Sequence, residues 1–321
     1  MDSRPESDSP AAARRPERGG GAAPRAQPEG LPAQPEGIPA QPEGIRARPA
    51  RILALSTSGA WCSVALYRHG FGDDESDCVS EPLGAQQSMS ILAMIDELCS
   101  GARIELSELD AIVFDAGPGS FTGLRIGCAV AQGLGFALDR PLVAVDSLRA
   151  LAWQRVRIGA QEATVLAAND ARRDEIYVAM YRIGTLPDDA GGVDGAGRLE
   201  TLEAPRIVSR ERFVDKIDEW LREHRALARA GTLVRAGDAW VHAPTALAWD
   251  ARFGAQLPAA PVADDAYVRA DALAELGCAD WHAGHAVAAS QAAPRYLRDK
   301  VALDRDEQRA ARERPAARSR E

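Results

Sequence analysis

Residues 115–138 read DAGPGSFTGLRIGCAVAQGLGFAL, a glycine-rich turn that runs into a long apolar segment. The apolar residues Ala111 to Phe114 come just before it and indicate a buried strand. Pro118 fixes one backbone angle of the turn, while Gly117 and Gly119 give it conformational freedom. We therefore expect a strand, a tight turn and then a helix that extends to Leu138.

The glycine-rich turn has two alternative interpretations. Free N–H groups at the start of the following helix would form an anion cradle, or the turn is a tight connection without a ligand. It is no P-loop, because Leu124 stands where that motif has lysine, and no nucleophile elbow, because Ser120 comes one position early. The candidate residues of this loop, for a structural role or a nucleotide contact, are Gly117, Pro118, Gly119, Ser120, Phe121, Thr122, Gly123 and Arg125.

Two segments have more apolar surface than one core-facing stripe needs. The helix expected from Leu124 to Leu138 is apolar or small on nearly every side and includes Gly127, Gly133 and Gly135. The helix expected from Gln87 to Ser100 has a similarly wide apolar arc. Either the same domain buries these surfaces or a partner does. The candidate interface residues are Met89, Leu92, Ile95, Cys99, Ile126, Val130 and Gly133.

Composition divides the chain into four parts. Residues 1–50 contain a seven-residue repeat with proline in every unit, which forbids a continuous helix and predicts an extended leader. Residues 304–321 form a charged tail, and residues 51–303 carry a net charge of −10. This charge is the wrong sign for independent nucleic-acid binding. We expect one lobe over 51–150 and a second over 151–303.

Cysteine usage and hydropathy indicate a cytoplasmic protein. The five cysteines are scattered and include no C-x-x-C pair, which favours reduced thiols over disulfides or a zinc site. We find no apolar run as long as a membrane span and no secretory signal. The five histidines show no metal-binding helix signature, so we assign no metal ligands.

A repeated hairpin pattern indicates an internally duplicated fold. Ala54-Leu55-Ser56 matches Ala167-Ala168-Asn169 at an offset of 113, and Val64 to Arg68 matches Val178 to Arg182 at an offset of 114. Chance similarity between two hairpins is the alternative. The turn of the second hairpin contains Asp170 and Arg172, which either contact a ligand or partner or are merely polar turn residues.

The motifs taken together resemble those of one family. They are RILALSTSGAWCSVALY from Arg51, AGPGSFTGLRIG from Ala116, RPLVAVDSLRALA from Arg140, NDARRDEIYVAMY from Asn169 and PRYLRDKVA from Pro294. In this combination the chain is similar to the TsaB family of bacterial tRNA threonylcarbamoyladenosine biosynthesis proteins, formerly called glycoprotease-like or M22-type. The resemblance covers about residues 51–303. It implies an α/β, two-lobed actin-like ATPase (ASKHA, RNase H-like) fold in which a β-hairpin begins each lobe.

The resemblance also implies a function. Members of the family are non-catalytic partners of the paralogue TsaD, and the ATPase TsaE completes the complex that transfers threonylcarbamoyl to N6 of adenosine 37 in ANN-decoding tRNAs. The resemblance thus implies tRNA contact only through the complex, no tightly bound cofactor, ATP or ADP only in the complex, no membrane, and a homodimer without the partner. It also implies that the two apolar helices pair with TsaD or with a second copy.

Two departures from the pattern bear on catalysis. Ser56 stands where actin-like ATPases commonly have the aspartate that orders the metal–nucleotide water shell, and serine has no fixed negative charge for this task. Gln87-Ser88 stands where many relatives have His-Ser, and the two metal-binding histidines of the catalytic paralogue are missing. The alternatives are a metal-dependent peptidase-like or small-molecule kinase-like enzyme, and a dimer whose helices only complete its own core.

Overall fold

The computed structural model describes residues 48–82, 87–157, 162–184, 199–225, 232–254 and 266–298 of the 321. The predicted charged tail, the glycine-rich segment 188–197 and all but the last three residues of the predicted leader lie outside the described residues. The side chain of Met89, one of the predicted interface residues, lies outside them as well.

The first sheet has buried apolar strands at its centre and the polar strand β3 at one edge. Its order is β3-β2-β1-β4-β5. Strand β1 pairs antiparallel with β2 and parallel with β4, which is itself parallel to β5. β1 and β4 are buried almost throughout, because helices cover both faces of the sheet. The strands are β1 (Ala50–Ser56), β2 (Trp61–His69), β3 (Glu75–Pro82), β4 (Ala111–Gly117) and β5 (Leu142–Asp146).

The second sheet repeats this arrangement and confirms the duplication. Its order is β8-β7-β6-β9, with β6 antiparallel to β7 and parallel to β9. Leu55 pairs with Val64 in the first hairpin, and their sequence matches Ala168 and Val178 pair with each other in the second. The strands are β6 (Ala163–Arg172), β7 (Glu175–Ile183), β8 (Leu199–Ser209) and β9 (Thr232–Ala236).

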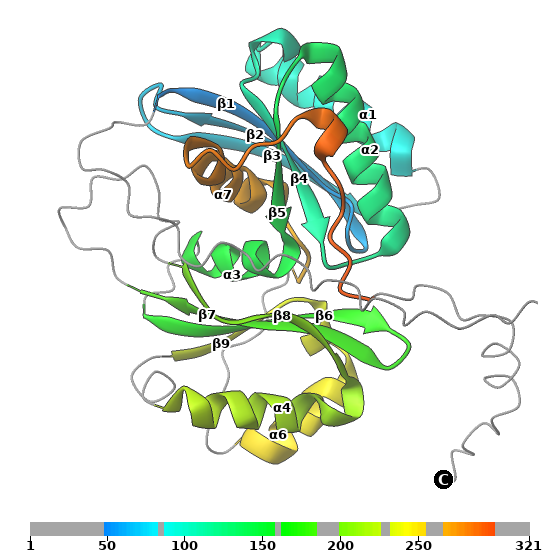
Figure 1. Cartoon of the computed structure of the whole chain (residues 1–321), viewed down its shortest axis with the longest axis vertical. Helices are drawn as coiled ribbons and strands as arrows, with labels where there is room; N and C mark the ends of the chain where they lie inside the picture. Colours follow the sequence, from blue (N-terminus) through cyan, green and yellow to red (C-terminus); the bar gives the residue numbers. More distant parts are fainter. Residues whose placement is uncertain are drawn as a thin grey trace, which may run out of the picture. The chain divides into compact units, whose positions relative to one another are not determined.

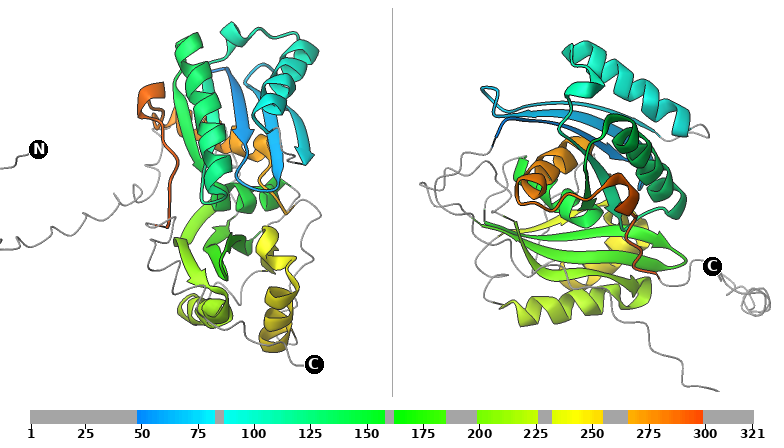
Figure 2. Two further views of the ribbon diagram at one scale, coloured as in Figure 1. Left: turned by 90° about the vertical axis from the view of Figure 1, so that its right-hand side faces the viewer. Right: turned by 45° about the horizontal axis from the view of Figure 1, so that its top comes forward.

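The helices and sheets form alternating layers (Figure 1). Helices α1 (Gln87–Ala102) and α2 (Phe121–Leu138) pack on the outer face of the first sheet. α3 (Ser147–Arg157) and α7 (Ala270–His282) lie between the two sheets and share one apolar core with both. α4 (Arg210–Glu223) and α6 (Ala243–Phe253) cover the outer face of the second sheet. Figure 2 shows the same order from two other sides.

Some elements differ from the sequence-based expectation. The sequence analysis did not identify α6. The lobe boundary expected at residue 150 falls inside α3, and α7 returns to pack on β1 and β2 of the first sheet. Side chains of both sheets bury α7, so its position depends on contacts far apart in the sequence. The short 3-10 helices are Leu106–Glu108, Asp238–Trp240 and Ala289–Gln291.

The first turn of α2 lies directly against the turn between β1 and β2. A Cβ atom on Gly123 would overlap the carbonyl oxygen of Thr57, and one on Gly127 would lie 2.8 Å from Thr57 Oγ1. Near the other end, a Cβ on Gly135 would collide with Leu142. A Cβ on Gly133, in contrast, would meet no atom within 4 Å. Contacts within the chain therefore explain three glycines of α2, most strictly Gly123 because it meets backbone, and they do not explain Gly133.

We expect Gly123→Ala to destabilise the protein by about 2 kcal/mol or more, because the added methyl must displace the backbone at Thr57. Gly133→Ala is the matched control in the same helix. It should stabilise the chain by up to about 1 kcal/mol, since alanine is the better helix former and the site is open. Urea unfolding of the two variants measures both effects. Equal effects of the two substitutions would contradict the packing described for α2.

Candidate functional site

The glycine-rich loop is closed by the protein's own backbone. Ser120 N donates to Ser58 O at 2.7 Å, and Thr57 Oγ1 donates to Gly123 O at 2.7 Å. A Cβ on Gly119 would lie 2.6 Å from Ser58 O. Ser120 caps α2, accepting a bond from Gly123 N at 3.4 Å. The turn after β1 thus contacts Gly119, Ser120 and Gly123 directly. These three residues fit the interpretation of the loop as a tight connection.

A cleft of about 530 Å³ lies beside this loop, at the tip of the second hairpin. It brings together two groups of residues that the sequence analysis identified separately: Gly119 to Thr122 on one side, and Asp170 with Arg172 on the other. It also includes two components that the sequence analysis missed as site residues. These are Asp238, which follows β9, and the extended segment 295–298.

The charged groups at the hairpin tip are engaged with one another. Asp170 forms ion pairs with Arg210 at 2.9 Å and with Arg172 at 3.4 Å. Asp238 accepts a hydrogen bond from the backbone N–H of Asp170 at 2.7 Å, and burial raises the pKa of its carboxyl. Asp170 and Arg172 therefore have partners inside the chain, consistent with a role in holding the turn.

The segment 292–298 crosses between the two lobes. Arg295 N donates to Ala116 O in β4 at 2.7 Å, whereas Arg298 donates to Ala171 O in the second hairpin at 3.1 Å. Between these two contacts, Tyr296 accepts a hydrogen bond from Arg125 Nε at 3.1 Å, and the Arg125 guanidinium lies 3.8 Å from the ring centroid of Phe121. Arg125 thus helps to fix this segment to α2.

Ser56 belongs to a buried hydrogen-bond network. Its hydroxyl donates to Asp115 Oδ2 at 2.7 Å, while Asp115 Oδ1 accepts bonds from Gly117 N at 3.0 Å and from the Ser147 hydroxyl. Burial raises the pKa of Asp115, and the hydroxyl donors partly oppose this shift. Asp115 is 3% exposed, so this carboxyl connects β1, β4 and α3 inside the protein.

Asp146 is a second buried carboxyl, next to the first. Its Oδ1 accepts bonds from the backbone N–H groups of Leu148 at 2.8 Å and Arg149 at 2.9 Å, so it caps α3. Burial raises its pKa from 3.8 to about 6. Neither Asp115 nor Asp146 lines the cleft.

The predicted interface residues on α1 and α2 differ in how far they are exposed. Ile95 is 2% exposed and Cys99 6% exposed, so these two predicted interface residues pack inside the first lobe. Leu92 is 53% exposed, Gly133 is exposed, and Ile126 and Val130 are half-buried. Phe136, 66% exposed on α2, is an apolar surface residue that the sequence analysis did not select.

The exposed side of α2 has little polar character. Ala129, Gly133, Phe136 and Ala137 are exposed, and no charged residue occurs between Ile126 and Leu138. By length and composition α2 is also the one helix of the described residues that is long and apolar enough to cross a membrane, contrary to our expectation that no run reaches that length. Its contacts with β4 and with the 3-10 helix Ala289–Gln291 place its other side in the first lobe.

Comparison with known proteins identifies relatives over most of the chain. The family model "TsaD: tRNA N6-adenosine threonylcarbamoyltransferase" matches residues 82–312. The Escherichia coli tRNA threonylcarbamoyladenosine biosynthesis protein TsaB is 31% identical over 255 residues, which are 78% of this chain and 96% of that protein. The Haemophilus influenzae protein of the same name is 38% identical over 140 residues, 44% of this chain and 57% of that protein.

A solved structure supports the same relationship. YeaZ from Pseudomonas aeruginosa superposes with a TM-score of 0.59 at 32% identity, covering 77% of this chain and all of that one. The two sheets with matching strand order and the flanking helices confirm the expected two-lobed actin-like α/β fold.

Asp146 gives the protein a specific pH dependence. Its folded pKa is raised, so the folded state takes up this proton before the unfolded state does. The contribution of Asp146 to stability therefore grows by about 1.4 kcal/mol per pH unit from about pH 6 down to about pH 4, and is lost as the pH rises through 6.

Asp146→Asn should keep the cap on α3 and remove this dependence. We test this prediction by measuring the free energy of unfolding of wild type and variant at several pH values and comparing the two. Asp139→Asn, at an exposed aspartate after α2, is the control. A wild-type curve parallel to that of Asp146→Asn over this range would contradict the assignment.

Proposed function

Because the chain belongs to the TsaB family of tRNA threonylcarbamoyladenosine biosynthesis proteins, we propose that it acts as a non-catalytic scaffold and activator subunit. In this role it pairs with the catalytic paralogue TsaD. TsaE completes the complex that installs threonylcarbamoyl on N6 of adenosine 37. The chain serves tRNA threonylcarbamoyladenosine biosynthesis, and the detailed division of roles is the proposal.

The exposed side of α2 is the observation that carries the proposal. Gly133 costs the helix about 1 kcal/mol relative to alanine, and no contact within the described residues requires it. The adjoining exposed residues Ala129 and Ala137 are small, and Phe136 is a large apolar side chain beside them. A surface of this kind allows a second helix to approach closely around one aromatic anchor.

Charge and chemistry support a partner role over independent catalysis. The net charge of −10 over residues 51–303 disfavours direct tRNA binding, so we propose that tRNA is contacted through the complex. Ser56 donates inward to Asp115 and supplies no carboxylate at the end of β1. Thr57 and Ser58 lie against Gly119 and Gly123 of the glycine-rich loop, and we propose that ATP or ADP acts only in the complex.

The same surface serves a homodimer when the partner is absent. A second copy of the chain presents the same helices α1 and α2. A symmetric pair of two copies would therefore bury Leu92 and Phe136 of both chains. We further propose a cytoplasmic location, where the five free cysteines stay reduced.

Leu92→Glu and Phe136→Glu should abolish pairing with TsaD and leave the isolated chain folded, within about 0.5 kcal/mol of wild type. Ile95 lies three residues after Leu92 in the same helix but is buried. Ile95→Glu should therefore destabilise the chain by more than about 4 kcal/mol. Leu247→Glu is the matched control, since Leu247 is 68% exposed on α6 of the second lobe. Co-purification with TsaD and thermal unfolding of each variant measure these effects.

The corresponding activity assay is threonylcarbamoyladenosine synthesis by TsaD and TsaE, with and without this chain. We expect synthesis to require the chain, and Leu92→Glu or Phe136→Glu to reduce it at least tenfold while Leu247→Glu does not. Synthesis that runs equally well without the chain, or intact pairing in both surface variants, would refute the proposed role.

A further inference from the structure

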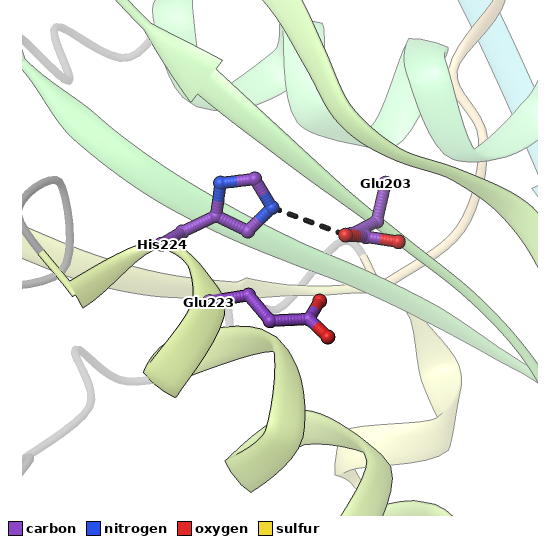
Figure 3. A group of neighbouring side chains, drawn as sticks. All are labelled: Glu203, Glu223 and His224. Carbon is purple, nitrogen blue, oxygen red and sulfur yellow. Dashed lines mark hydrogen bonds and ion pairs between the residues drawn. The ribbon is translucent and has the colours of Figure 1, made fainter.

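Three side chains with metal-ligand chemistry meet at the outer end of the second lobe, far along the chain from the glycine-rich loop. Glu203 comes from β8, and Glu223 and His224 come from the end of α4 (Figure 3). One potential ligand atom from each side chain lies within 4.8 Å of the other two. Within the described part of the chain, this is the set of three histidine, cysteine or acidic side chains whose potential ligand atoms lie so close together.

The spacing of two of these atoms already matches a metal site. His224 Nε2 lies 3.1 Å from Glu203 Oε1. A tetrahedral Zn²⁺ ion with ligand distances of about 2.0–2.1 Å separates neighbouring ligand atoms by roughly 3.3 Å. The two atoms are therefore spaced within a few tenths of an ångström of a pair of zinc ligands. Glu223 is exposed and can complete the set by turning its side chain.

The surroundings hold two of the ligands in place. Arg206 donates to Glu203 Oε2 at 2.9 Å, which leaves Oε1 directed at His224, and the Arg206 guanidinium lies 5.0 Å from the ring centroid of Trp220. Hydrogen bonds of this kind orient ligating carboxylates in metal sites. The His224 backbone N–H donates to Trp220 O at 2.9 Å, so the imidazole is carried by the last turn of α4.

The charges at this position favour a cation. Glu203 and Glu223 carry two negative charges, and the Arg206 guanidinium on Glu203 Oε2 offsets one of them, so the group keeps a net negative charge. The carbonyl end of α4 adds a partial negative charge at the same place. The nitrogen and oxygen donors suit Zn²⁺ better than Mg²⁺ or Ca²⁺, which prefer oxygen ligands alone.

We propose that Glu203, Glu223 and His224 form a Zn²⁺-binding site that ties the end of α4 to the edge strand β8, with the fourth position taken by water. The site is separate from the surface of α1 and α2 and does not depend on the proposed function. The sequence shows no signature for it, because Glu203 and the pair Glu223-His224 are twenty residues apart and meet only through the packing of α4 on the sheet.

Isothermal titration of the full-length, EDTA-treated chain with ZnCl₂ tests the site. We expect one high-affinity equivalent in wild type, and an affinity at least tenfold lower in His224→Ala and in Glu223→Gln. Glu219→Gln is the matched control, since Glu219 is a carboxylate on the same helix that pairs with Lys216 at 2.8 Å. It should bind as wild type does. Circular dichroism in EDTA verifies that each variant is folded.

Co²⁺ in place of Zn²⁺ identifies the donor atoms by absorption spectroscopy. Tetrahedral d–d bands without thiolate charge-transfer bands, lost in His224→Ala, would support the site. Thiolate bands would show that cysteines hold the ion and would overturn the proposal. Absence of a high-affinity equivalent in wild type, or equal binding by wild type and both ligand variants as for an adventitious ion only, would overturn it as well.

Discussion

The close approach of α2 to the turn after β1 is the contact on which the first lobe depends. Gly119, Gly123 and Gly127 have no side chains at the points where the backbone of Ser58 and the backbone and hydroxyl of Thr57 reach the helix. Two hydrogen bonds, from Ser120 N and from Thr57 Oγ1, hold the turn and the helix together. Glycine permits this separation, because a Cβ atom at Gly119 or Gly123 would occupy the space of the opposing backbone and one at Gly127 would crowd the Thr57 hydroxyl.

This contact also explains the composition of α2. One side of the helix carries the glycines and apolar residues that pack on the sheet, and the other side carries Ala129, Gly133 and Phe136 with no charge among them. A helix that served only its own lobe would have polar residues on its outer side. The inner side of α2 therefore serves the fold, and the outer side is the surface on which the proposed partner role rests.

The interior near the cleft is arranged for structure. Ser56, Ser147 and Gly117 donate to Asp115, and Asp146 caps α3, so both buried carboxyls are occupied by groups of the chain itself. At the hairpin tip Asp170 is paired with Arg210 and Arg172. These polar groups therefore hold the elements around the cleft to one another.

The sequence by itself determined the strand before the glycine-rich turn, the helices α1 and α2 and the duplication, because these follow from local apolar periodicity and from similarity between two hairpins. It placed Ser120 and Asp170 in turns, but only the tertiary structure decided that both line one cleft with residues 295–298. Likewise, periodicity identified Leu92 and Ile95 as apolar residues of one helix without deciding which is covered. The physical reason is that burial, and the meeting of Glu203 with His224, depend on elements that pack together across long separations in the chain.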